Sequence, residues 1–515
     1  MSDMEKSRRV FTWLDVFLWS IANPLASGLL FFSVTVTGFP GAYGGVIPLS
    51  FFFAGLLIYP LVLITAIFSS FFPRTGSFYY FITRGLDPVV GIIAICLYLY
   101  ALFHGIGYLS YSSVKILGSA LVTSGVITGD SQLVYLGEVF SKPITALVFG
   151  ALVVIVVFAL NISGVRVLKA SLRITTLIPL VALSYILILS IPFSNTVFVN
   201  NWNRFFNGSY YSITQLALSG GPGIPRLEAV DPFTSTSYLI LVALWAFFGV
   251  ETTGFIAGEV ENPHRSYWRG LLAGYSVLLA LYIATPVVVT AFTGYEFISA
   301  YSYLYNFYRS ELAGIMGTTP IEPGISLYLS IYFANKYLVI LLGITGFLFY
   351  FNTVLTSFAT VIRIFHAISS DKLMPGRSLR SHYYIAFTLS LLVLTPFYLV
   401  EVYPVLKLAL FGIAVLNYGF FMVFIGISAL SISLVRERLF RQLVFKNRKL
   451  MVISGVILTS TGFASTLIGL GESLIIVGFT MIVSLLILGM LVLMVYTGRK
   501  RGVDYEVLFS EIPPY

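Results

Sequence analysis

The sequence predicts an all-α polytopic membrane protein. Of its 515 residues, 58% are hydrophobic and only 10% are charged, which is too apolar for a water-soluble fold. A mean hydropathy of +0.94 over this length allows about a dozen membrane-spanning helices of ~20 residues each. The single cysteine, Cys96, lies inside an apolar segment, so we expect no intramolecular disulfide and no cysteine-based metal site.

Twelve apolar segments have the length needed to cross a bilayer. The first follows a ten-residue tail and is longer than the apolar region of a cleaved signal, so we expect it to be retained as a helix. The predicted spans are 11–36, 45–70, 89–116, 143–160, 172–192, 236–259, 268–293, 336–366, 383–400, 403–431, 450–471 and 473–497.

The net charge of +9 reports orientation rather than a nucleic-acid partner. With the N-terminus placed inside, 23 of the 30 lysines and arginines fall in the tails and connections on the inner side. This bias is the positive-inside pattern, and it predicts a multi-pass protein of the cell membrane with both termini cytoplasmic. The partner that the charge indicates is the lipid bilayer.

Two long connections are rich in polar and turn-forming residues. They cover residues 195–237 and 296–335, and both are predicted to lie on the outer side. Connections of this length are usually lids or functional loops, although simple solvated linkage fits the first one equally well.

The sixth predicted span contains a carboxylic acid close to mid-membrane. Glu251 follows the pair Phe248-Gly249, and an ionised carboxylate at this depth is costly. One interpretation is a structural acid that is hydrogen-bonded inside the helix bundle. The other is that Gly249 and Gly254 let the helix unwind around a polar site, since irregular backbone at this depth must be buried in protein or line a cavity.

The first span has a matching weak point. Asn23 and Pro24 are followed by Ala26, Ser27 and Gly28, and a proline removes a backbone donor and clashes with the preceding turn. A kink or break is therefore expected there. Interrupted helices at corresponding positions of two halves indicate a transporter binding site.

The two breaks offer complementary groups to an amino acid. Backbone N–H groups of Ala26, Ser27 and Gly28, at the start of a half-helix, suit a carboxylate. Carbonyl groups around Phe248 and Gly249 suit an ammonium group, and the Trp245 ring is placed to close over the side chain. Asn23 belongs to the same predicted site.

The residues alone allow two coupling ions, a proton and sodium. Without a fixed cation in its own helix, Glu251 is expected to exchange a proton and to link pH to transport. Thr356 and Ser357 in the eighth span, together with a carbonyl near Ala22, are the candidate ligands of a sodium ion, although adjacent hydroxyls there are more often packing residues.

Several stretches resemble the amino acid, polyamine and organocation transporter superfamily. They are the break at 23–28, residues 72–79, 161–166, 249–265 and 371–375. The resemblance covers roughly residues 10–430 and implies a LeuT-type fold of two inverted five-helix repeats followed by two C-terminal helices. The implied parts are a tail at 1–10, repeats at 11–192 and 236–431, an outer connection at 193–235, helices 11 and 12 within 432–497, and a tail at 498–515.

Trp245, six residues before Glu251, and the motif at 107–111 resemble the basic amino acid and polyamine antiporter branch. The resemblance implies that the tryptophan gates the substrate and that the glutamate takes part in proton-linked switching. Pro24 and Ala26 depart from the residues usual in that break, and no lysine lies near Pro179 in the fifth span. These departures leave the coupling ion open.

The predicted function is secondary active transport of amino acids or related amines by alternating access, as a permease or an antiporter, with a proton as the coupling ion. A sodium-coupled symporter is the alternative within this class. A channel would need a repeated polar lining, which is not evident. An integral-membrane enzyme would need clustered catalytic groups, whereas the four histidines are scattered. We therefore expect no enzymatic activity, no catalytic or metal site and no cofactor.

Overall fold

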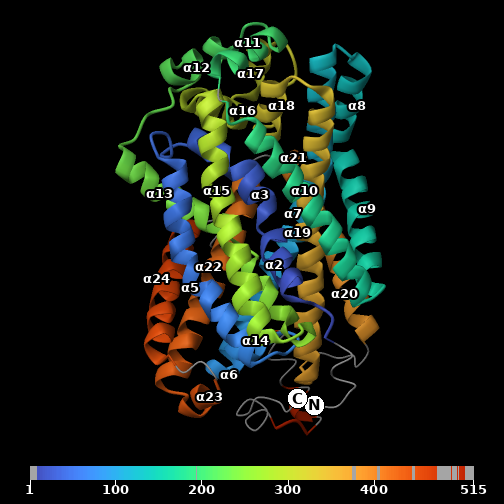
Figure 1. The fold of residues 1–515 in the computed structure, drawn as a ribbon, viewed down its shortest axis with the longest axis vertical. Coiled ribbons are helices and arrows are strands. Elements are labelled where there is room, and N and C mark those ends of the chain that lie inside the picture. Colours follow the sequence, from blue (N-terminus) through green and yellow to red (C-terminus); the bar gives the residue numbers. More distant parts are fainter. Residues whose placement is uncertain are drawn as a thin grey trace.

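A computed structural model describes residues 9–192, 194–373, 379–402, 406–443 and 447–471, with a few isolated positions between 489 and 504. In this part of the chain the only β pairing consists of two isolated bridges, Phe11 with Val260 and Gly221 with Ile224. Figure 1 shows long helices running along the longest axis of the molecule. The all-helical class predicted from the sequence is confirmed.

Ten helical segments in the described residues are long and apolar enough to cross a membrane. This supports a polytopic membrane protein, and the count of twelve stays a prediction because the last predicted span, 473–497, lies almost wholly outside the described residues. The ten segments comprise α5 (Ile47–Phe71), α7 (Pro88–Thr128), α9 (Pro143–Ile162), α10 (Val165–Leu189), α13 (Pro232–Ala246) with η3 (Val250–Glu259), α14 (Pro263–Ser266) with η4 (Tyr267–Leu271) and α15 (Leu272–Thr293), α19 (Lys336–Ser370), α20 (Leu379–Leu392) with α21 (Leu394–Val402), α22 (Leu406–Leu434) and α24 (Arg448–Gly471).

The first predicted span is divided into short pieces, so it is not one of the ten. The pieces are α2 (Trp13–Ala22), α3 (Leu25–Ser27), η1 (Gly28–Phe32), α4 (Ser33–Thr35) and η2 (Val36–Gly38). The helical hydrogen bonding is interrupted at Asn23 and Pro24, where the proline cannot donate, and it continues as a π-type turn from Gly28. The interruption therefore lies where the sequence predicts it.

The sixth span is interrupted between Ala246 and Val250. Gly249 has a φ of +102°, a conformation that strongly favours glycine, and the chain continues as the 3₁₀ helix η3. A Cβ atom at Gly249 would lie 1.8 Å from Oδ1 of Asn23. The two interruptions therefore touch each other in the centre of the molecule.

The long connections form a cap of helices at one end of the bundle (Figure 1). The first connection contains α11 (Asn195–Phe205) and α12 (Tyr210–Ser219). The second contains α16 (Tyr295–Phe307), α17 (Arg309–Met316) and α18 (Ile325–Phe333). The buried ring of Trp202 packs edge-on against Phe297 and Tyr301, with ring centroids 4.7 and 5.2 Å away. Aromatic packing thus orders segments whose polar composition indicated loops.

The opposite end, here called the basic end, carries α6 (Ser77–Gly85), α14 and α23 (Glu437–Gln442). Three acidic side chains there are paired with cations from other helices: Asp371 with Arg84, Glu259 with Arg363, and Asp15 with both Arg173 and Lys169. The chain near Phe11 also bonds to the backbone of η3, since Val10 and Phe11 donate to the carbonyl of Glu259. These contacts hold the ends of the first and sixth spans together.

Candidate functional site

A buried tyrosine connects the two interruptions. Oη of Tyr282, on α15, lies 2.6 Å from the carbonyl oxygens of both Pro24 and Ala246. These carbonyls lie at the interruptions, where the helical pattern of backbone donors is disturbed. A phenol carries one proton, so it donates to one carbonyl at a time and can alternate between them. Gly28 packs directly against the same hydroxyl, since a Cβ there would lie 2.3 Å from it.

The long helix α19 satisfies the polar groups of the first interruption. Thr353 donates its hydroxyl to the carbonyl of Asn23 at 2.7 Å. The amide Nδ2 of Asn23 donates in turn to the hydroxyls of Thr356 and Ser357, at 2.9 and 3.1 Å. The hydroxyl pair predicted to ligate sodium therefore accepts hydrogen bonds from a side-chain amide.

Glu251 is fully buried and is held by donors from three elements. The phenol of Tyr98, on α7, donates at 2.8 Å, and that of Tyr418, on α22, donates at 3.4 Å. The N–H of Gly249 adds a third contact at 3.1 Å. Among the ion pairs of the described residues none includes Glu251, so phenols and an amide take the place of a cation.

A pocket lies beside the interruptions. Its lining combines aromatic rings, small residues of α7 and two polar side chains: Asn23, Pro24, Ala101, Gly105, Tyr108, Leu109, Trp245, Ala246, Phe248 and Thr353. The ring of Phe248 also contacts both tyrosines of the Glu251 cluster, with centroid distances of 4.7 Å to Tyr418 and 5.9 Å to Tyr98. One aromatic side chain thus separates the pocket from the buried carboxyl group.

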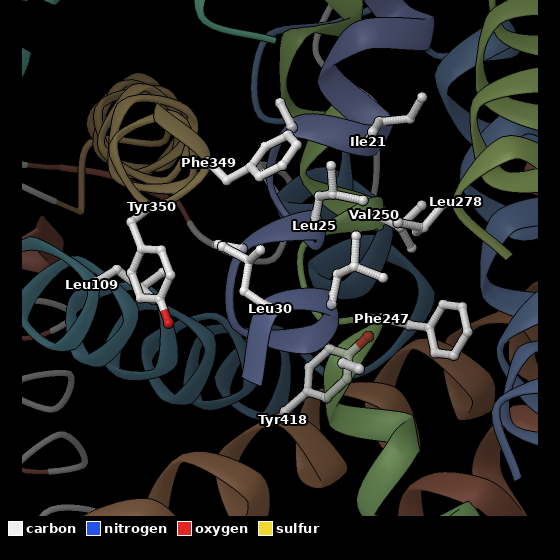
Figure 2. Packing of buried hydrophobic residues seen from close by; sticks show 14 of the residues in the cluster. Ile21, Leu25, Leu30, Leu109, Phe247, Val250, Leu278, Phe349, Tyr350 and Tyr418 are labelled. Atoms are coloured by element: carbon white, nitrogen blue, oxygen red, sulfur yellow. The ribbon is translucent and has the colours of Figure 1, made fainter. Parts of the chain in front are cut away.

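Figure 2 shows how the core surrounds this region. Leu25 and Leu30, from the first span, pack in the same buried cluster as Phe247 and Val250, from the sixth. Phe349 of α19 completes the apolar surroundings. Apolar side chains surround the polar contacts of this region, and such low-polarity surroundings strengthen hydrogen bonds.

Comparison with known sequences identifies the family. The sequence profile described as "Amino acid permease" matches residues 11–500. The chain belongs to the amino acid permease family. The family is described as one of permeases, and the match covers both interrupted spans and the pocket beside them.

Individual relatives of this permease are distant. It is 26% identical to the methylthioribose transporter of Bacillus subtilis over 57% of its own length and 58% of that protein. It is 20% identical to the histidine permease HisP of Lactococcus lactis, over 58% and 55% of the two chains. The dicarboxylic amino acid permease of Saccharomyces cerevisiae is 22% identical, over 54% of this chain and 41% of that one. The matched part spans about half the length of these curated relatives.

The permease brings only part of the predicted substrate site into the pocket. Asn23, Trp245 and Phe248 line it. Ala26 and Gly28 are buried against other parts of the bundle, and Gly249 packs against Asn23. The side chain of Ser27 lies outside the described part of the chain.

Sequence reasoning missed the groups that reach the site from other helices. They are Tyr98, Tyr108, Tyr282, Thr353 and Tyr418. Tyr108 carried a signal, since it follows Gly105 and Gly107 and belongs to the motif at 107–111. Nothing in the sequence around Tyr98 or Tyr282 separates them from the other tyrosines, 33 in all.

Proposed function

We propose that this permease is a secondary active transporter that moves α-amino acids or related amines by alternating access. The observation that carries the proposal is the pocket between two interrupted helices, lined by the rings of Trp245 and Phe248 and by the polar side chain of Asn23. Such paired interruptions place unpaired backbone groups next to a ligand in the middle of a membrane. Two of the relatives above are named for amino acids, which supports the same substrate class.

In this proposal the ligand's two ends meet different elements. The carboxylate faces the N–H groups at Ala26, Ser27 and Gly28, and the ammonium group faces the carbonyl groups near Phe248 and Gly249. Oδ1 of Asn23 is buried and accepts no hydrogen bond within the described residues, so it is a further acceptor for the ammonium group. Phe248 and Trp245 then cover the ligand, with Phe248 able to pass a displacement on to the tyrosines around Glu251.

A proton is the coupling ion that the contacts favour. A neutral Glu251 carboxyl carries an O–H donor on one of its two oxygens, so at least one of the three donors around it must rearrange, and this biases one state against the other. The sodium alternative requires Thr356 and Ser357, whose hydroxyls already accept from Asn23. A cation at this position would have to displace that amide.

The proposal also includes the orientation of the chain in the membrane and its branch within the transporter superfamily. We place the basic end in the cytoplasm of the cell, with both termini on that side of the plasma membrane. The fold is then LeuT-type, with inverted repeats at 11–192 and 236–431, a connection at 193–235, two further helices within 432–497, and tails at 1–10 and 498–515. Trp245, six residues before Glu251, and the motif at 107–111 are what support the basic amino acid and polyamine antiporter branch.

Uptake by proteoliposomes tests the proposed function. A panel of labelled amino acids, with and without an inward proton gradient, is expected to identify at least one substrate. Trp245→Ala should raise its KM by about tenfold, because an aromatic cover over a cation contributes about 1–2 kcal/mol. Phe233→Ala is the matched control, since that ring lies at the start of the same helix and is 82% exposed. A panel without uptake, or equal effects of the two variants, would contradict the proposal.

Uptake is expected to continue unchanged when sodium is replaced by potassium or choline. The reason is that the amide of Asn23 already satisfies both candidate hydroxyls. The measurement is the initial rate at fixed pH in each salt. If uptake required sodium, and if Thr356→Val and Ser357→Ala weakened the sodium dependence, the sodium-coupled alternative would replace the proton.

A further inference from the structure

Two asparagines of the chain stand in an acceptor sequence for N-linked glycans, which is Asn-X-Ser or Asn-X-Thr with X other than proline. One is Asn161, in the segment 161–163, and the other is Asn207, in the segment 207–209. Both segments end in serine, so the surroundings of each asparagine decide between them. A glycan is bulky and hydrophilic and needs a surface position in the aqueous phase.

Asn207 lies in the turn between α11 and α12, in the helical cap (Figure 1). It is exposed, and so is Gly208 after it. Asn207 has a φ of +49° and Gly208 a φ of +70°, so both adopt the left-handed conformation of a tight turn, which asparagine and glycine favour. The connection leaves α10 at Leu189 and enters α13 at Pro232, so this turn is well separated along the chain from both spans.

The side-chain amide of Asn207 has one hydrogen bond and one further hydrogen. Nδ2 donates to the carbonyl of Met316, at the end of α17, at 3.3 Å. It packs next to Gly317, where a Cβ atom would lie 2.2 Å from Nδ2, so the lack of a side chain there makes space for the amide. An amide nitrogen of asparagine carries two hydrogens. Replacement of the second one by a sugar therefore leaves the contact with α17 available.

Asn161 has the opposite surroundings. It is 2% exposed and lies in the last turn of α9, where its Nδ2 donates to the carbonyl of Val157 at 2.9 Å. The next helix, α10, brings Lys169 to Asp15 at the basic end. Asn161 is therefore buried and lies toward the side that we place in the cytoplasm, whereas the cap is on the outer side.

We propose that Asn207 carries an N-linked glycan on the outer face of the cap. The inference goes beyond transport and rests on the orientation proposed above. The sugar donor is an oligosaccharide joined through phosphate to a polyisoprenoid lipid. Nδ2 of Asn207 forms a bond to C1 of the first sugar, the bond from C1 to the phosphate oxygen breaks, and the lipid phosphate leaves as one amide proton is released.

The folded cap also sets the time of transfer. Ser209, the third residue of the acceptor sequence, is buried, and its hydroxyl accepts a hydrogen bond from Nε1 of Trp202 at 3.0 Å. A transferase that reads this hydroxyl reaches it only before the cap has folded. The glycan is therefore added as the chain emerges on the outer side, and the turn folds with Asn207 exposed.

Mass spectrometry of the protein purified from the cells that produce it natively tests the proposal. Trypsin cleaves after Arg204 and Arg226 and releases the peptide 205–226, whose only asparagine is Asn207. In the parent, this peptide is expected to carry hexose or N-acetylhexosamine residues on the asparagine. Asn207→Gln and Ser209→Ala should each abolish the modification. Ser209→Thr keeps the acceptor sequence and a hydroxyl for Trp202, so it should keep the glycan.

Asn200→Gln is the matched control, because Asn200 is an exposed asparagine of α11 outside any acceptor sequence. It should keep the same excess of intact mass over the sequence mass as the parent. An unmodified 205–226 peptide from a parent that transports would overturn the glycan and leave the proposed function intact. An excess of mass that persists in Asn207→Gln would overturn it as well. A glycan found on Asn161 would overturn the proposed orientation together with this inference.

Discussion

Glu251→Gln is expected to flatten the pH dependence of uptake between roughly pH 5 and 8, because glutamine keeps the size of the side chain and cannot titrate. The carboxyl group is buried, and the groups that face it are the phenols of Tyr98 and Tyr418 and the N–H of Gly249. All of them donate to the charged carboxylate, whereas the O–H of a neutral carboxyl needs one of these groups to turn away or to accept instead. Proton exchange at this site therefore has to change the contacts of the sixth span.

Two sets of variants make this result specific. Glu261→Gln, an exposed acid just beyond η3, should keep the pH profile of the parent. Tyr98→Phe and Tyr418→Phe should shift the profile, because each removes one donor from the carboxylate. The measurement is the initial uptake rate across the pH range at saturating substrate. A Glu251→Gln protein with the full profile of the parent would make this residue a structural acid.

The interruptions were predictable because their causes are local. Proline at 24 cannot donate a backbone hydrogen bond whatever surrounds it, and Gly249 takes a φ of +102° that few other residues tolerate. The burial of Glu251 was predictable for the same reason, since it lies within an apolar segment. None of these inferences needed a contact from another helix.

What the sequence could not supply is the set of partners that make the interruptions stable. The hydroxyl of Thr353 is 330 residues from the carbonyl that it satisfies, and the amide of Asn23 is 333 residues from Thr356. Helical periodicity says which face of a span is apolar but not which other span it meets. The same limit explains the cap, where buried rings such as Trp202 order two connections that composition alone assigned to loops.

A helix interrupted in a membrane survives only if neighbouring side chains replace its lost hydrogen bonds. Here the replacements come from α15 and α19, which are themselves long regular helices. The two regular helices α15 and α19 thus provide polar contacts to the interrupted first and sixth spans. If the hydroxyl of Tyr282 donates to the carbonyl of Pro24 in one state and to that of Ala246 in the other, it can stabilise both conformations of the transporter.

Tyr282→Phe is therefore expected to lower thermal stability and to reduce uptake by more than tenfold. The variant keeps the ring, which packs edge-on against Phe247 at 5.0 Å, but it removes the hydroxyl shared by the carbonyls of Pro24 and Ala246. Leaving a buried carbonyl unsatisfied costs about 1–3 kcal/mol, which corresponds to roughly a five- to 150-fold change in an equilibrium.

Tyr275→Phe is the matched control for this effect. Tyr275 lies on the same helix and is equally buried, and its hydroxyl donates at 2.6 Å to the carbonyl of Gly55. That carbonyl is inside the continuous helix α5 and keeps its helical hydrogen bond when the phenol is lost. Thermal unfolding and proteoliposome uptake should both change much more for Tyr282→Phe than for Tyr275→Phe. Equal losses in the two variants would mean that the hydroxyl of Tyr282 only fills space, and that the two interruptions are held in place by packing alone.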